Sequence, residues 1–161
     1  MSLIIRSATE KDISLLSSII RASFIDVAKR FSLTRQNCPK HPSNCEDDWI
    51  EDELSKGVNY YILEVDGVPS GSVGILQNGP DLSYLMRLGI LPENRNRGFG
   101  KKLMNFALEK LREKETKTVE IGVISNQTEL VEWYEGFGFR VAGRRNFGHL
   151  PFEVTFMSKR L

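Results

Sequence analysis

The sequence predicts a single α/β domain built on a mixed, mostly antiparallel sheet that is flanked by helices. Segments with apolar residues every three or four positions, typical of amphipathic helices, alternate with short runs rich in β-branched residues. The runs at 60–65, 68–76 and 82–91 are separated only by short turns, which is typical of an antiparallel meander. A length of 161 residues suits one domain with one core, so residues 1–161 are assigned to a single domain.

The first part of the chain predicts a short strand followed by helices. Residues 3–6 are β-rich, and Thr9 followed three positions later by Asp12 is a capping box that begins an amphipathic helix. We expect this helix to end near residue 21. The apolar pattern that continues to Phe31 predicts a second helical piece after it.

Residues 32–46 lose this periodicity and predict a loop that contains two prolines, two cysteines and a histidine. Ser43, with Glu46 three positions later, predicts the start of the next helix, which ends at Gly57. The next two β-rich runs are separated by the dipeptide Asp66-Gly67, which favours a two-residue type I′ hairpin turn.

The second half of the chain predicts a crossover and a closing pair of strands. A helix that lasts to about residue 114 follows the meander, and a connection of this length allows the next strand to lie parallel to the last meander strand. The remaining elements are predicted as a strand at 119–123, a short helix that ends at Gly138, and strands near 139–145 and 152–159.

The charge balance and the apolar pattern exclude several classes of protein. With 22 basic and 21 acidic residues, overall charge favours neither nucleic acid nor a membrane surface as a partner. No stretch is apolar enough to cross a bilayer, and the first residues lack the apolar core of a signal peptide. The two cysteines, Cys38 and Cys45, fit a reducing compartment, so we expect a cytoplasmic protein.

The stretch Arg95-Asn96-Arg97-Gly98-Phe99-Gly100-Lys101 lies between a predicted strand and a predicted helix and has the features of an anion site. Its two glycines let backbone N–H groups turn toward an anion, and a helix N-terminus adds roughly half a unit of positive charge. Basic side chains flank both glycines. We interpret the stretch as a pyrophosphate-binding loop; the alternative is a solvated basic turn.

Spacing decides which phosphate ligand fits this loop. A P-loop would require glycine where Arg95 stands, and Ser or Thr where Lys102 stands. The dinucleotide fingerprint would require a small residue at Leu103 and a place after the first strand of a βαβ unit. Both schemes fail, and the pattern that remains is R-x-x-G-x-G, formed by Arg95, Gly98 and Gly100.

With this motif in this order of elements, the chain resembles the GNAT superfamily of N-acetyltransferases over nearly its whole length. The helices before the meander, the meander before the motif, and Tyr134 followed by Gly138-Phe139 all match the family. The resemblance implies the GNAT fold and acetyl-CoA as co-substrate, without a metal. It also implies that the backbone of residues 97–101 binds the pyrophosphate, with the side chains of Arg95, Arg97 and Lys101 near the phosphates.

The resemblance further implies where the chemistry takes place. Leu88-Gly89-Ile90 matches the splayed strand end that supplies a backbone N–H to the acetyl carbonyl, and Gly89 fits a bulge there. Tyr134 matches the tyrosine that protonates the coenzyme A sulfur, whereas a tyrosine on the apolar face of a short helix is the structural alternative. Asn126 lies eight residues before Tyr134, one more than the family's asparagine, so a cofactor contact by Asn126 is left open.

The general base is the least determined residue. Several family members place a catalytic glutamate at the position of Tyr84, and a neutral tyrosine serves less readily as a base. Asp81, Glu153 or a water relay are the alternatives, and we favour water. The missing carboxylate keeps a second function open, a coenzyme A-binding regulatory or interaction module without acetyl transfer.

The loop with the pattern Cys38-x-x-His41-x-x-x-Cys45 has residue types that can bind zinc. A structural zinc site needs four ligands, and the only further histidine is His149, so we favour free thiols over a metal site or a disulfide. The family forms its acceptor site largely from this region. His41, and His149 in the segment His149-Leu150-Pro151-Phe152, are therefore predicted to line the acceptor pocket, with a stiffened surface loop as the alternative.

The sequence thus predicts an acetyl-CoA-dependent N-acetyltransferase that moves acetyl by direct transfer to an amine of a small-molecule or peptide acceptor. Near-neutral charge does not identify the acceptor. The oligomeric state is left open, a homodimer included.

Overall fold

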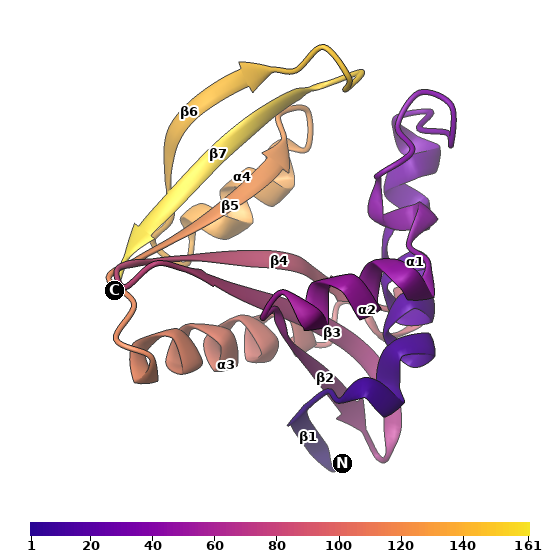
Figure 1. Cartoon of the computed structure of the whole chain (residues 1–161), viewed down its shortest axis with the longest axis vertical. Coiled ribbons are helices and arrows are strands. Elements are labelled where there is room, and N and C mark those ends of the chain that lie inside the picture. Colours follow the sequence, from indigo (N-terminus) through magenta and orange to yellow (C-terminus); the bar gives the residue numbers. More distant parts are fainter.

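Seven strands and four α-helices make up the structure, a computed structural model that describes residues 1–161 (Figure 1). The strands are β1 (Leu3–Ser7), β2 (Asn59–Val65), β3 (Val68–Asn78), β4 (Leu82–Ile90), β5 (Thr118–Ile124), β6 (Arg140–Asn146) and β7 (Glu153–Arg160). The helices are α1 (Ile13–Arg30), α2 (Asp47–Ser55), α3 (Phe99–Glu113) and α4 (Thr128–Glu135).

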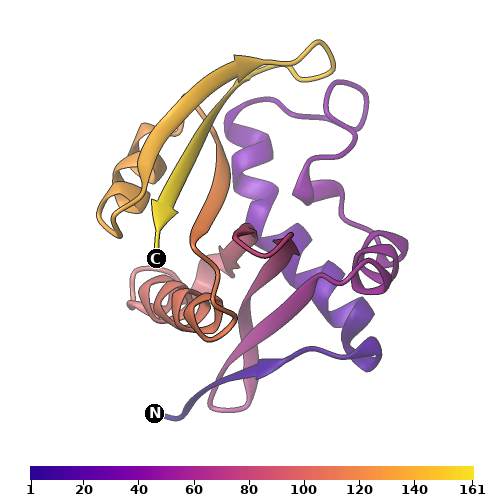
Figure 2. The same cartoon turned by 60° about the vertical axis from the view of Figure 1, so that its left-hand side comes forward.

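All seven strands form one sheet in the order β1-β2-β3-β4-β5-β7-β6. Only β4 and β5 are parallel, and α3 forms the crossover between them. Helices α1 and α2 pack on one face, whereas α3 and α4 pack on the other (Figures 1 and 2). The predicted mixed, mostly antiparallel sheet flanked by helices is therefore confirmed. No helix combines the length and the apolar character that crossing a membrane requires.

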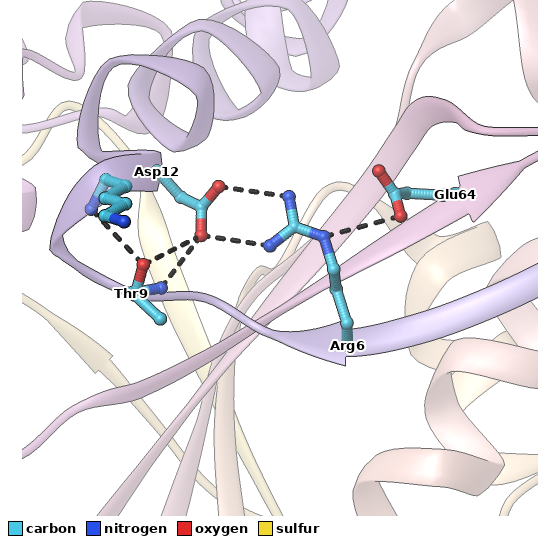
Figure 3. Close-up of polar contacts among 5 residues, drawn as sticks. Arg6, Thr9, Asp12 and Glu64 are labelled. Atoms are coloured by element: carbon cyan, nitrogen blue, oxygen red, sulfur yellow. Dashed lines mark hydrogen bonds and ion pairs between the residues drawn. The ribbon is translucent and has the colours of Figure 1, made fainter.

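The predicted capping box forms at a short 3-10 turn (Glu10–Asp12) that leads directly into α1 (Figure 3). The backbone N–H of Thr9 donates to the Asp12 carboxylate at 2.9 Å, and the Thr9 hydroxyl accepts from the Lys11 N–H at 3.3 Å. Arg6 on β1 donates to both oxygens of Asp12 at 3.0 Å, and its Nε lies 3.4 Å from Glu64 on β2. These contacts join the first two strands to the first helix.

Helix α1 differs from its prediction, because it continues without interruption to Arg30. The expected break near residue 21 is wrong. The segment contains neither glycine nor proline, and Phe24 continues the apolar stripe against the core of Leu16, Ile20 and Ile50. Nothing in the chain therefore ends the helix early.

Helix α2 also begins later than predicted, at Asp47. The expected capping box of Ser43 and Glu46 is wrong, because Ser43 belongs to a short 3-10 turn (Pro42–Asn44) that precedes the helix. His41 caps this turn by accepting the Ser43 N–H at 3.2 Å. The Ser43 hydroxyl lies 2.8 Å from the same His41 nitrogen, so it is not available to cap α2.

The hairpin of β2 and β3 forms as predicted. Asp66 and Gly67 have φ values of 51° and 79°. Both values are positive, as a type I′ turn requires.

Strand β4 contains a bulge that places the site. Ser72 of β3 pairs with Gly89, and Gly74 pairs with Met86, so Arg87 and Leu88 together oppose a single residue. Arg87 adopts a φ of 51°, a left-handed conformation that costs a non-glycine residue roughly 1–2 kcal/mol. The bulge thus lies just before Gly89, where it was predicted.

Gly89 has a different physical role, which is close packing. A Cβ at this position would lie 2.8 Å from the Cβ of Ser23 on α1. Only glycine therefore allows α1 to lie this close to β4.

The sheet opens between β4 and β5, because these two strands pair only over their first residues. Strands β4 and β5 pair only from Leu82 to Tyr84 on β4 and from Thr118 to Glu120 on β5. Both strands then continue separately, and Figure 1 shows β5, β6 and β7 turning away from β4. Backbone groups of β4 that face this opening have no partner strand.

Candidate functional site

A cavity of about 560 Å³, called the larger cavity below, lies at the end of β4 between α1, α4 and the start of α3. Nine of the ten residues predicted to bind the cofactor line it: Leu88, Gly89, Ile90, Arg95, Asn96, Gly98, Phe99, Gly100 and Lys101. The tenth, Arg97, is exposed, and its guanidinium lies 4.9 Å from the centre of the Phe99 ring. The fold therefore brings together residues that the sequence separates by up to 13 positions.

The loop before α3 has a backbone suited to an anion. Asn96 and Gly98 both have positive φ, 61° and 81°, and Gly98 is the N-cap of α3. The first N–H groups of a helix have no partners within the helix, and the first turn of α3 contains no acidic side chain. The positive end of the helix dipole is thus not neutralised where it meets the larger cavity.

Arg95 is held by α1 rather than left free for a ligand. Its Nη2 donates to the Ser23 carbonyl at 2.6 Å, its Nε donates to the Ile90 carbonyl at 3.0 Å, and its Nη1 pairs with Asp26 at 2.5 Å. Arg95 therefore positions the loop against α1 and β4. The exposed cations at the loop are Arg97 and Lys101.

Replacing Arg95 with leucine should lower the free energy of unfolding by about 2 kcal/mol, because buried carbonyls lose a charged donor. Burial alone would raise the pKa of Asp26, but the hydrogen bond and charge of Arg95 outweigh it and lower that pKa. The part of this stabilisation that comes from the Arg95–Asp26 ion pair is present at neutral pH, and it is lost as the pH falls through the lowered pKa of Asp26. Urea denaturation of Arg95→Leu and of the control Arg97→Leu measures this loss of stability. An equally large loss in Arg97→Leu would contradict the positioning role of Arg95.

Two buried serines beside Gly89 have hydroxyls without partners. Ser23 lines the larger cavity, and Ser72 faces Gly89 across the β3–β4 pair. Neither hydroxyl makes a hydrogen bond, although both oxygens are fully buried. An unpaired buried polar group costs about 1–3 kcal/mol, so this region suits a ligand or a water that supplies the missing partner.

Tyr134 is positioned by aromatic packing on α4. Its ring lies edge-on to Trp133 and Phe139, with centroids 5.2 and 5.6 Å apart, and only 7% of the residue is exposed. Burial raises the pKa of Tyr134, so its hydroxyl carries a proton at neutral pH. Trp133 lines the larger cavity and packs against Gly100, whereas its neighbour Tyr134 is not among the residues that line the cavity.

Several residues of the larger cavity were not anticipated from the sequence. Arg30 on α1 and Glu129 on α4 form an ion pair between the two helices that line the cavity. The other unanticipated residues are Ser23, Phe24, Asp26, Val27, Asn94, Gln127, Leu130 and Trp133. Six of these eight lie on α1 or α4, and helical periodicity alone does not say which part of a helix faces a cavity.

A second cavity of about 310 Å³, called the second cavity below, lies between α2 and the β4 bulge. Its lining residues are Lys40, Asp48, Trp49, Asp52, Glu53 and Arg87. Arg87 lines the second cavity, whereas its neighbour Leu88 lines the larger one. The bulge therefore stands between two cavities.

A polar cluster holds the Arg87 side chain. Glu53 accepts from Arg87 Nη1 at 2.6 Å and from the Tyr60 hydroxyl at 2.7 Å, and Arg87 also contacts that hydroxyl at 3.0 Å. All three side chains are largely buried. No sequence pattern indicates this cluster, because the positive φ of Arg87 is set by the bulge.

The structure does not bring Tyr84 to the larger cavity. Its hydroxyl accepts from the Asn78 side chain at 3.0 Å, in the part of β4 that is still paired with β5. Asp81 precedes β4 and pairs with Lys117 at 3.4 Å. Asp81 lies about 30 Å from Ile90 along the strand, which is too far for direct proton transfer. Glu153, the first residue of β7, is partly buried.

The other predicted substrate residues lie outside both cavities. His41 is 6% exposed and packs edge-on to Phe24 at 6.2 Å, whereas His149 is exposed beside Phe147. Substrate contacts by these two histidines stay predictions, and whether the exposed Asn126 contacts the cofactor stays open.

The two cysteines of the same loop, Cys38 and Cys45, are buried free thiols. Burial raises the pKa of Cys45 to about 11. No three His, Cys, Asp or Glu side chains are grouped as metal ligands.

Acid should destabilise the protein through His41. Burial lowers its pKa from 6.5 to about 4, so stability is fully present above pH 6.5 and is lost as the pH falls toward 4. The loss amounts to about 3 kcal/mol. His41→Asn, which keeps a cap acceptor, should flatten the dependence of the unfolding free energy on pH between 7 and 4. The exposed His149→Asn should not, and an equal flattening in both variants would contradict the prediction.

Comparison with known proteins agrees with this geometry. A model of the Acetyltransferase (GNAT) family matches residues 25–139, which include the end of α1, the meander, the glycine loop and Tyr134. No curated protein matches the sequence.

The fold also matches solved structures at low identity. The ribosomal-protein-S18-alanine N-acetyltransferase from Escherichia coli has a TM-score of 0.79 at 15% identity, covering 99% of this chain and 94% of that one. The PaiA N-acetyltransferase from Thermoplasma acidophilum, solved with coenzyme A, has a TM-score of 0.74 at 17% identity over 100% of both chains. A GNAT family acetyltransferase from Elizabethkingia anophelis, solved with acetyl-CoA, has a TM-score of 0.71 at 13% identity, covering 99% and 98%.

These likenesses show the fold. The family model matches well over half of the chain and includes the loop that the sequence singles out. The chain therefore belongs to the GNAT acetyltransferase family.

Proposed function

We propose that the protein binds acetyl-CoA in the larger cavity and transfers the acetyl group directly to an amine that enters from the second cavity. The observation that carries this proposal is the β4 bulge. Its two residues, Arg87 and Leu88, line different cavities on either side of one strand. A donor and an acceptor can therefore approach the same backbone from opposite sides.

The donor end of the proposal rests on the loop before α3. The amides of residues 97–101 would hold the pyrophosphate, because the helix start there is not neutralised and Arg97 and Lys101 add positive charge. For the rest of acetyl-CoA, the small residues Gly89 and Gly100 leave open space in the cavity, and the Ser23 hydroxyl offers an unpaired polar group. Two proteins of the same fold were solved with coenzyme A or acetyl-CoA.

Two groups of the chain would take part in the transfer. Bound acetyl-CoA supplies an acyl thioester. Strand β4 has no partner strand on its β5 side beyond Tyr84, so a backbone N–H of residues 88–90 would be free to donate to the carbonyl oxygen, where negative charge develops. The protonated hydroxyl of Tyr134 would donate to the departing sulfur.

The amine must lose a proton before it reacts, because an alkylamine of pKa about 10 is mostly charged at neutral pH. Glu53 already accepts hydrogen bonds from Arg87 and Tyr60, so we do not assign it as the base. Tyr84 does not reach the cavity. We therefore assign proton removal to water in the open second cavity.

Thiol release from acetyl-CoA, measured with a panel of alkylamines, amino sugars and peptides with free N-termini, tests this function. We expect turnover with at least one amine, at a rate that rises between pH 7 and 9 as more amine becomes neutral. Saturable acetyl-CoA binding without turnover on the whole panel would favour the coenzyme A-binding module. Absence of acetyl-CoA binding would contradict both functions.

A further inference from the structure

The helix beside the second cavity is strongly acidic. Five of the nine residues of α2 are Asp or Glu, and none is basic. Asp48 and Asp52 lie one helical turn apart and line the cavity together with Glu53. A concave surface with this charge raises the local concentration of cations.

A cation of the chain already lies in the second cavity. The ammonium of Lys40 is 4.9 Å from the centre of the Trp49 ring, and the Arg87 guanidinium is 5.7 Å from it. The face of an indole ring attracts cations, most strongly where water is partly excluded. Lys40 is an ammonium on a four-carbon chain, so the cavity accommodates the end group of a linear alkylamine.

The acidic groups differ in how far they are neutralised. Glu53 is paired with the largely buried Arg87 at 2.6 Å, and Asp52 pairs with Lys56 at 2.9 Å on the surface. Asp48 is exposed and has no such partner at the cavity rim. The lining has three acidic side chains and two basic ones, and Lys56 from outside the lining pairs with Asp52, so Asp48 is the lining acid that has no ion-pair partner.

The size of the second cavity limits the shape of its ligand. A volume of about 310 Å³ is at the small end for ligand sites, which suits a linear chain better than a multi-ring amino sugar. One end of such a chain would lie over Trp49 near Asp48. The other end would point toward the bulge, where Arg87 and Leu88 separate the two cavities.

From these observations we propose that the acceptor is a linear aliphatic amine that carries at least one further positive charge, such as a diamine or polyamine. One ammonium binds at Trp49, Asp48 and Asp52, in place of Lys40, while another amine reacts. This inference rests on the proposed acetyl transfer, because it names the acceptor of that reaction.

Calorimetric titration of the full chain with spermidine, 1,4-diaminobutane and n-butylamine, without acetyl-CoA, tests the binding. We expect spermidine to bind at least about tenfold more tightly than n-butylamine, and this preference should weaken with added salt. The double variant Asp48→Asn, Asp52→Asn should weaken spermidine binding about tenfold. Glu51→Gln, an exposed change on α2 outside the cavity, should change it less than about twofold.

The Lys40→Met variant should strengthen spermidine binding, and misfolding cannot imitate a gain in affinity. It removes the competing ammonium from Trp49, so spermidine should bind about threefold more tightly. Equal affinities for spermidine and n-butylamine would overturn the proposal. So would a loss in Glu51→Gln as large as in the double variant, or weaker binding in Lys40→Met.

A parallel acetylation assay with the same amines separates this inference from the function on which it rests. If acetyl-CoA binds and n-butylamine is acetylated as well as spermidine, the acceptor class is wrong and acetyl transfer stands. If spermidine binds as expected but acetyl-CoA does not, the proposed acetyl transfer is wrong and the acceptor assignment fails with it.

Discussion

Replacing Gly98 with valine should raise the dissociation constant of acetyl-CoA by about 100-fold, or about 2.8 kcal/mol. Gly98 has a φ of 81° and caps α3, and a β-branched residue does not adopt this conformation without strain. The backbone would shift, and the N–H groups at the start of α3 would no longer converge on the pyrophosphate. Loss of one or two charge-assisted hydrogen bonds accounts for this magnitude.

A matched control exists for this variant. Gly79, in the turn between β3 and β4, has a φ of 84°. A Cβ at Gly79 or at Gly98 would meet no atom within 4 Å. Gly79→Val therefore introduces the same kind of backbone strain away from the larger cavity. Isothermal titration of both variants should show weakened binding only in Gly98→Val, and unchanged affinity in that variant would contradict the placement of the pyrophosphate.

Replacing Tyr134 with phenylalanine should lower kcat about 100-fold and leave the affinity for acetyl-CoA within about twofold. The substitution removes only the hydroxyl, so the ring still packs against Trp133 and Phe139. The departing thiolate would then lack its proton donor. Steady-state kinetics with the best amine of the panel, together with thermal denaturation, separates the loss of an acid from a loss of stability.

Tyr61→Phe controls for the removal of a buried phenol. Tyr61 is equally inaccessible but lies on β2, packed edge-on against Phe106. We expect its kcat to remain unchanged. Full activity in Tyr134→Phe, or an equal loss in Tyr61→Phe, would show that Tyr134 is a core residue and not the acid.

The sequence predicted those elements that local chemistry determines. The Thr9–Asp12 capping box and the Asp66-Gly67 turn depend on neighbouring residues, and both form as expected. The glycine loop could be placed before a helix for the same reason. The end of α1 could not be predicted in this way, because no local signal near Arg21 continues or stops the helix. Packing on the core decides where the helix ends.

The residues that line the larger cavity could be predicted where the backbone itself forms the surface, and less well where distant side chains meet. Gly98 and Gly100 line the larger cavity through their own backbone. Arg95 instead contacts Ser23 and Asp26, about 70 residues earlier, and no spacing rule indicates such a contact.

The second cavity illustrates the same limit. Arg87 faces Glu53 and Trp49 only because the bulge rotates it toward α2. A sequence shows that a glycine permits a bulge, but strand pairing decides which residue occupies it. Tyr84, at the position where several family members have a catalytic glutamate, lies in the part of β4 that pairs with β5 and lines neither cavity.

An NMR titration of the ¹⁵N-labelled protein with coenzyme A tests the central claim most directly, because it reports each backbone amide separately. The structure predicts that the largest shift changes fall on residues 97–101 and 88–90, with the second cavity, including Asp48 and Trp49, nearly unaffected. Saturable changes confined to the larger cavity would support the donor site. The largest changes at α2 and the second cavity, or no changes at saturating coenzyme A, would contradict it.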